Sequence, residues 1–277
     1  MNMLRDIDNQ DTWIRNYAVL AATLIVLLLV TAGAGLFGSE IYDAFSPAKY
    51  VQESRAQDLI TLVLGVPFLV LAVGGVRRER AWGFPLWTGV LAYELYVYAI
   101  YAFGGVYNIF FLAYIAVASL SLYGIVGVLS GLDGEWFQQS IGEELPRRLI
   151  GGFFLLITAI FAAIWIASVL ETISTGVEDS GHLVFVIDLM VVLPAFAITA
   201  VMLFRRQALG DALAGLMLIK FDSLCIAISL GQLFRSLNGI SVEAGLLGVF
   251  VTLGLVGLIF TGVYFMHFGH KDSRNHS

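Results

Sequence analysis

Residues 17–37, YAVLAATLIVLLLVTAGAGLF, form an apolar stretch without a single charged side chain. The hydrocarbon core of a bilayer is about 30 Å thick, and a helix needs about 20 apolar residues to cross it. Seven further, predominantly apolar stretches follow and take up most of the chain. They cover residues 58–76, 84–103, 109–129, 149–170, 183–204, 212–234 and 244–266. The sequence therefore predicts eight membrane spans.

The composition excludes several other classes of protein. The 277 residues are 59% apolar and 13% charged, with a mean hydropathy of +0.87, whereas soluble domains are about 45–50% apolar and about 25% charged. The net charge of −6 offers no basic face to nucleic acid. Cys225 is the one cysteine, so neither an internal disulfide nor a cysteine metal cluster can form.

The expected fold class is all-α: a polytopic helix bundle forming a single integral membrane domain over residues 1–277. Apolar and polar residues do not alternate with period two, which excludes strands of a membrane barrel. Backbone groups in lipid must then pair within each helix. The lipid bilayer is the first expected partner. An alternative is a signal peptide cleaved after Ala32-Gly33-Ala34, which would leave seven spans, but the apolar run is long for one and its flank is acidic.

Basic residues predict the orientation of the spans. Eleven bases lie on one side: Arg5, Arg15, Arg77, Arg78, Arg80, Arg147, Arg148, Arg205, Arg206, Lys271 and Arg274. Lys49, Arg55 and Arg235 lie on the other, and Lys220 is inside a span. Because cytoplasmic loops carry the excess of Lys and Arg, both termini are expected in the cytoplasm. The expected location is the plasma or inner cell membrane.

Two parts of the chain share a spacing. Asp58, Pro67, Arg77-Arg78, Gly89 and Glu94 in spans 2 and 3 parallel Asp188, Pro194, Arg205-Arg206, Gly215 and Lys220 in spans 6 and 7. A parallel repeat of four plus four spans, with halves 1–140 and 141–277, would produce this spacing, as in some transporters. Alternatively, the arginine pairs follow from the cytoplasmic bias alone and the prolines are coincidental.

Charged side chains inside the spans are the candidate binding groups. Such groups cost at least about 2.5–3.5 kcal/mol each at membrane depth, so they persist where something pairs with them or uses them. Glu94 and Lys220 lie near the middle of their spans, whereas Asp222, Asp188 and Asp58 lie nearer the outer side. We expect Lys220 to face Glu94, or else Asp188, in a polar pocket that opens outward. Tyr93 and Tyr98 are expected beside them.

Each of these residues also has a structural alternative. A Glu94–Lys220 ion pair can set only the register of two helices. The tyrosines can serve as packing and interfacial anchors, and Asp58 as the N-terminal cap of span 2. In the inner loop, Trp136, Phe137, Ile141 and Leu145 fit either one face of an interfacial helix ending at Pro146 or an irregular loop.

Glycines repeat along span 8, and the pattern has two interpretations. Gly245, Gly248, Gly254, Gly257 and Gly262 permit close helix contact, either within the bundle or in a homo-oligomer.

The leading functional hypothesis is a small-solute or proton-coupled transporter. Glu94 would exchange protons, Lys220 would tune it or bind an anionic group, and Asp188 and Asp222 would line an outer vestibule. The alternatives are a ligand-binding sensor, including a retinal-type Schiff base on Lys220, and a non-catalytic assembly protein. A lipid enzyme using two aspartates is less favoured, since the chain carries none of the common catalytic, metal or nucleotide motifs. No catalytic residue, metal or cofactor is expected.

Overall fold

The computed structural model describes residues 3, 10–38, 40–42, 49–176 and 181–269. These residues form eight helical spans, as predicted, and the fold is all-α. The spans are α1 (Gln10–Phe37), α2–η2–α3 (Lys49–Ile60, Thr61–Gly65 and Val66–Arg77), α4 (Gly83–Phe103), α5 (Phe111–Gly131), α7 (Arg147–Thr175), α8–η3–α9 (His182–Ile187, Asp188–Val192 and Leu193–Phe204), α10 (Ala208–Leu237) and α11 (Ala244–Met266). A short helix, α6 (Gly134–Ile141), and a final turn, η4 (His267–Gly269), complete the described structure.

The second span begins nine residues earlier than the sequence predicts. Residues 49–57 are polar, which ends the hydropathy signal at Asp58, yet the helix continues through them. The side chains of Gln52 and Ser54 are buried against the rest of the protein. Hydropathy therefore underestimates the length of this span, because its polar residues face protein rather than lipid.

The outer surface of the bundle is apolar along the spans. Large side chains such as Val26, Leu71 and Ile259 are more than half exposed. An apolar surface of this extent is stable against lipid and not against water. The chain is a multi-pass membrane protein.

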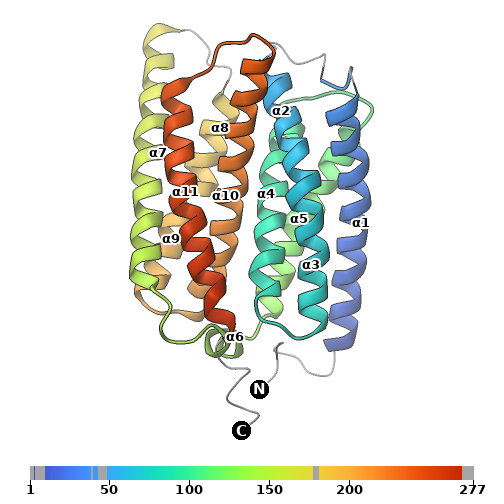
Figure 1. The fold of residues 1–277 in the computed structure, drawn as a ribbon, viewed down its shortest axis with the longest axis vertical. Helices are drawn as coiled ribbons and strands as arrows, with labels where there is room; N and C mark the ends of the chain where they lie inside the picture. Colours follow the sequence, from blue (N-terminus) through green and yellow to red (C-terminus); the bar gives the residue numbers. More distant parts are fainter. Residues whose placement is uncertain (1–2, 4–9, 39, 43–48, 177–180, 270–277) are drawn as a thin grey trace.

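The spans form two groups that meet at α4 and α10 (Figure 1). We call α1 to α5 the first group and α7 to α11 the second. The spans α4 and α10 are the most buried of the eight and pack directly on each other. A Cβ atom added at Gly89 of α4 would lie 2.6 Å from Cβ of Ile219, and one added at Gly215 of α10 would overlap Cβ of Pro85. Two glycines thus bring the central helices into close contact.

Spans 2 and 6 share an irregular turn at the same place. Each contains a π-helical segment, η2 and η3, followed by a proline, Pro67 or Pro194. Each span then ends in a turn where a non-glycine residue has a positive φ, 55° at Glu79 and 54° at Arg206. π-Helical turns of this kind often mark functional sites.

The predicted helix of the inner loop is present but short. Asp133 caps α6 by accepting a hydrogen bond from the Trp136 backbone N–H at 2.8 Å. Phe137 and Ile141 are buried on one face. The helix ends at Ile141 rather than at Pro146, because Gly142 adopts a positive φ of 81°. This helix lies at the end of the bundle where α1 begins and α11 ends, which we call the α6 end (Figure 1).

The glycines of α11 divide between two roles. Added Cβ atoms at Gly254 and Gly257 would collide with Cys225 and Asp222 of α10, so these two glycines serve contact within the bundle. Gly245, Gly248 and Gly262 have open space beside them. A homo-oligomer contact through these three stays a prediction. The bases Arg5, Lys271 and Arg274 lie outside the described residues.

The close contact of α4 with α10 predicts the effect of a larger side chain. Gly89→Val should lower the free energy of unfolding by about 1–3 kcal/mol, because the valine overpacks against Ile219. Gly152→Val in α7 is the matched control, since Gly152 is exposed with nothing within 4 Å. Thermal unfolding in detergent, followed by size-exclusion fluorescence, compares the two. Equal losses in both variants would contradict the close contact.

Candidate functional site

A cavity of about 830 Å³ lies between the two groups of helices. Its wall includes α2 and α4 from the first group and all the spans of the second. It extends from Gly104, His182 and Glu243, at the helix ends opposite the α6 end, down to Lys220 near the middle of α10. We call it the central cavity. The sequence predicted a polar pocket that opens outward, whereas most of the residues in this wall are apolar and Lys220 and Asp188 are its buried charged groups. That the mouth faces the outside stays a prediction.

Lys220 is the buried cation of the central cavity. Its side chain is 4% exposed, and Nζ lies 4.0 Å from the centre of the Tyr96 ring on α4. A cation over an aromatic face is stabilised by the ring quadrupole. Asp188 is the carboxylate whose charge acts on this ammonium group. Neither residue has a direct ion pair among the described residues.

Asp188 is the opposing anion, at the first position of the π-helical turn η3. Its Oδ2 accepts a hydrogen bond from Nε1 of Trp165 on α7 at 2.9 Å. Its Oδ1 is buried and has no hydrogen-bond partner within the described structure. An unsatisfied carboxylate oxygen in a buried site is costly, so it indicates a place for a donor that is not part of this chain.

Glu94 does not face Lys220, so the first expected partner was wrong and the second, Asp188, takes its place. Oε2 of Glu94 accepts a hydrogen bond from Thr61 of η2 at 3.1 Å. Oε1 approaches Gly65, where an added Cβ would lie only 2.5 Å away. Gly65 has no side chain and so leaves a space in span 2, which the carboxyl group of Glu94 fills. The Glu94 side chain therefore points toward span 2 and away from the central cavity.

Asp58 is not a helix cap, because α2 begins nine residues before it. Oδ2 of Asp58 accepts a hydrogen bond from the Tyr42 hydroxyl at 2.7 Å, beside Gly35 of α1. Burial is the main cause that raises the pKa of the Tyr42 phenol well above its usual value, and Asp58 adds to the effect. The tyrosine therefore stays protonated and continues to donate.

The other predicted site residues also lie outside the wall of the central cavity. Tyr93 donates to Oε1 of Gln57 at 2.7 Å, and the Tyr98 hydroxyl lies 2.6 Å from that of Thr31. Asp222 faces α11, where its Oδ2 accepts a hydrogen bond from Thr261 at 2.5 Å. These three side chains are within the helix packing and do not line the cavity.

At the mouth of the cavity, Arg235 of α10 ties the two groups together. Its Nη1 donates to Glu53 of α2 at 3.1 Å and to Glu243 at 3.2 Å, and both acids line the cavity. Its Nη2 donates to the Ser241 carbonyl oxygen. We call these residues the Arg235 cluster.

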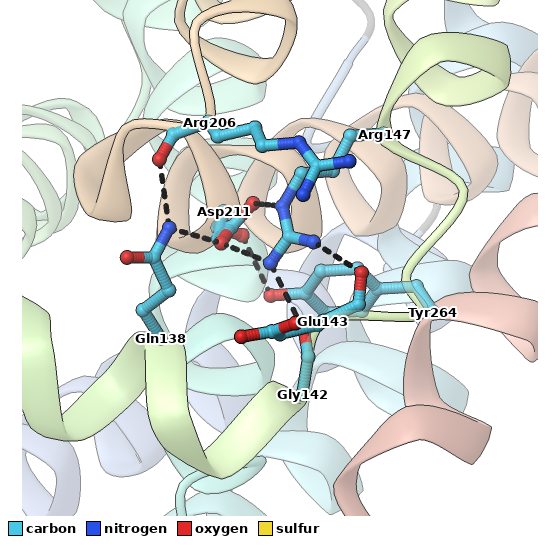
Figure 2. Close-up of polar contacts among 7 residues, drawn as sticks. All are labelled: Gln138, Gly142, Glu143, Arg147, Arg206, Asp211 and Tyr264. Carbon is cyan, nitrogen blue, oxygen red and sulfur yellow. Dashed lines mark hydrogen bonds and ion pairs between the residues drawn. The ribbon is translucent and has the colours of Figure 1, made fainter.

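A second buried cluster lies at the α6 end and is fully hydrogen-bonded (Figure 2). Nε and Nη2 of Arg147 donate to the two carboxylate oxygens of Asp211, each at 2.7 Å. Arg147 also donates to the carbonyl oxygens of Gly142 and Glu143, and Gln138 of α6 donates to Asp211 at 3.3 Å. This Arg147 cluster fastens the loop between α6 and α7 to the start of α10.

Sequence reasoning missed Trp165, Arg147, Asp211 and Arg235 as partners. One feature of the sequence could have indicated the pairing of Arg147 with Asp211, namely that this acid lies close to the predicted start of span 7. Trp165 gave none, since a tryptophan inside an apolar span carries no mark of its hydrogen bond. Among the described residues, no group of three or more His, Cys, Asp or Glu side chains could hold a metal ion.

Comparison with known proteins assigns no relationship: no protein-family model, curated protein or solved structure matches this chain. The functional argument therefore rests on the geometry of the central cavity.

The Arg147 cluster predicts a large loss of stability when it is broken. Arg147→Met leaves the fully buried Asp211 without its partner and should cost about 3–5 kcal/mol of unfolding free energy. The double variant Arg147→Met/Asp211→Leu should recover most of this loss, because it removes both charges. Arg148→Met, at an exposed neighbouring position, is the control. A double variant less stable than Arg147→Met would contradict this account.

Proposed function

We propose that the protein is a permease for a small solute, which binds in the central cavity between Lys220 and Asp188. One observation carries the proposal: a cavity of about 830 Å³ between two helix groups ends halfway through the bundle at an incompletely paired lysine and aspartate. Substrate sites of secondary transporters lie near the bilayer midplane at the interface of their repeats. Buried ionisable groups at that depth are by default candidates for a functional site.

The two polar clusters support a cycle of alternating access. The central cavity reaches the end of the bundle opposite α6, and the Arg147 cluster fills the α6 end with buried hydrogen bonds. The Arg235 cluster joins α2 to α10 across the mouth. We propose that this state faces the outside, that rearrangement at the α6 end opens the inner path, and that Arg235 and Glu53 hold the mouth closed in that inward state.

The orientation follows from the basic residues at the α6 end. Arg77 is the last residue of α3, Arg78 follows it, and Arg205 and Arg206 follow α9. Arg147 and Arg148 begin α7, and all of these helix ends lie at the α6 end. An excess of bases favours the cytoplasmic side. We therefore propose that the α6 end and both termini face the cytoplasm of the cell membrane and that the cavity opens outward.

We also propose that the two groups are repeats. The π-helical segment begins six residues before the proline in both copies, at Thr61 and Asp188. Twelve residues separate each proline from the positive-φ residue of the following turn. The corresponding pairs would be Glu94 with Thr61, joined by a hydrogen bond, and Lys220 with Asp188, which act on each other through their charges. The π turn and proline in each copy are the weak points at which the spans would bend.

Glu94 keeps a role in this proposal, separate from the solute site. Its carboxyl group has one unpartnered oxygen within the described structure and is fully buried in the first group. We propose that Glu94 exchanges a proton during the cycle, with Asp58 as the acid nearer the outside. Protonation would neutralise the Glu94 carboxylate inside the first group. The helices of that group would then move more easily.

An accessibility experiment tests the permease without knowledge of its solute. In a Cys225→Ala background, which removes the single native cysteine, Ser168→Cys places a thiol in the cavity wall. Leu216→Cys places one a turn closer to the α6 end than Lys220, on the same face of α10. In oriented vesicles, a membrane-impermeant thiol reagent should modify the Ser168→Cys variant from outside. The same reagent should modify the Leu216→Cys variant from inside. That reaction should be slower, because it occurs when the protein is in the inward state.

The Cys225→Ala chain without an added cysteine is the control and should remain unmodified. If Leu216→Cys never reacts from inside while Ser168→Cys reacts from outside, the cavity has one access route only. That result would contradict a permease and favour a ligand-binding sensor.

One observation favours a Schiff-base sensor as the second candidate. Phe161, Trp165, Phe185, Phe196, Phe221 and Phe250 line the cavity, an aromatic wall much richer than span 6 alone suggests. An aldehyde such as retinal would condense with the Lys220 amine to an imine, with loss of water. A permease predicts no visible absorption band after addition of all-trans-retinal. A band that appears in the wild type and disappears in Lys220→Arg would instead establish the sensor.

A further inference from the structure

The inner end of the central cavity has one unused donor group and one unused acceptor. The ammonium group of Lys220 contacts the face of Tyr96 and has no hydrogen-bond acceptor among the described residues. Oδ1 of Asp188 has no donor in hydrogen-bonding geometry there, although Trp165 donates to the other oxygen and the Tyr96 hydroxyl lies near this carboxylate. Both side chains are more than nine-tenths buried. A ligand that satisfies both must itself have an acceptor for the lysine and a donor for the aspartate.

The charges of the site also limit the net charge of that ligand. Lys220 and Asp188 are of opposite sign, and each is more than nine-tenths buried. A bound anion would leave one negative charge uncompensated, and a bound cation one positive charge. Uncompensated charge is expensive in a low-dielectric interior, whereas a ligand of zero net charge leaves the site balanced.

The rest of the wall determines the body of the ligand. Between the polar end and the mouth, the cavity is lined by large apolar side chains, among them Phe185, Leu224, Ile228 and Phe250. Burial of apolar surface against such a wall is favourable in proportion to the area that is removed from water. A ligand with a bulky apolar or aromatic body is therefore favoured over a fully polar one.

We infer that the central cavity takes an amphipathic zwitterion, of which a hydrophobic α-amino acid is the simplest form. The ligand carboxylate binds Nζ of Lys220, the ligand ammonium donates to Oδ1 of Asp188, and the apolar side chain lies between the phenylalanines. This inference rests on the proposed function for the site itself and adds the chemical class of the solute.

Three probes with the same phenyl body separate the possible ligand classes. L-Phenylalanine carries both charges, 3-phenylpropionate lacks the ammonium group and 2-phenylethylamine lacks the carboxylate. Equilibrium binding to the purified full chain is measured by scintillation proximity with tritiated L-phenylalanine and competition by the other two. Each of the two should bind at least about tenfold more weakly, because each leaves one buried polar group of the site unpaired.

Variants assign the two contacts. Lys220→Met and Asp188→Asn should each weaken L-phenylalanine binding at least about tenfold, because each removes one charge that the zwitterion pairs with. Asp222→Asn is the matched control, a buried acid of α10 that faces α11 outside the cavity, and it should bind L-phenylalanine as the wild type does. A single symmetric peak in size-exclusion chromatography shows that each variant is folded.

Other results would either contradict the zwitterion or separate it from the proposed permease. If 3-phenylpropionate binds as tightly as L-phenylalanine, the site takes an anion; if 2-phenylethylamine does, it takes a cation. Absence of binding by all three to the folded wild type also refutes the zwitterion. Binding of L-phenylalanine without inward access at Leu216→Cys would uphold the ligand and refute the permease. Inward access at Leu216→Cys without binding of L-phenylalanine would uphold the permease and refute the ligand.

Discussion

The energetic cost of a charge away from water controls the arrangement of this bundle. Lys220 and Glu94 lie near the middle of their spans and Asp188 lies nearer the cavity mouth, and each of the three is more than nine-tenths buried. Each needs a polar neighbour, an aromatic face or a cavity, and the helices are positioned to supply one. The contact between α4 and α10 brings Tyr96 over Lys220. The π-helical turn of span 6 brings Asp188 to the same cavity.

The two helix groups use this constraint differently. In the first group the acids are enclosed by hydroxyl groups: Asp58 by Tyr42, and Glu94 by Thr61. In the second group, Lys220 and Asp188 instead line the central cavity. This division explains why the cavity wall takes two spans from the first group and all spans from the second.

The two ends of the bundle differ in how their polar groups are satisfied. At the α6 end, Arg147 and Asp211 are buried and saturated with hydrogen bonds, so they need nothing from outside the chain. At the opposite end, Arg235 pairs with carboxylates that are partly exposed at the cavity mouth. Exposed ion pairs contribute little and break easily, whereas a buried pair is costly to break. The bundle is therefore easier to open at the cavity mouth than at the α6 end.

The amino-acid sequence by itself determined the class of protein, the eight spans and the depth at which each charge lies, because these follow from length and hydropathy along a helix. It also named Lys220 and Asp188 as candidate binding groups, together with five side chains that lie outside the cavity wall. Only the tertiary structure decided which side chains meet. Periodicity gives the direction of a side chain around its own helix but not the rotation of the neighbouring helix. Gly65 receiving the carboxyl group of Glu94, and Trp165 holding Asp188, depend on that rotation.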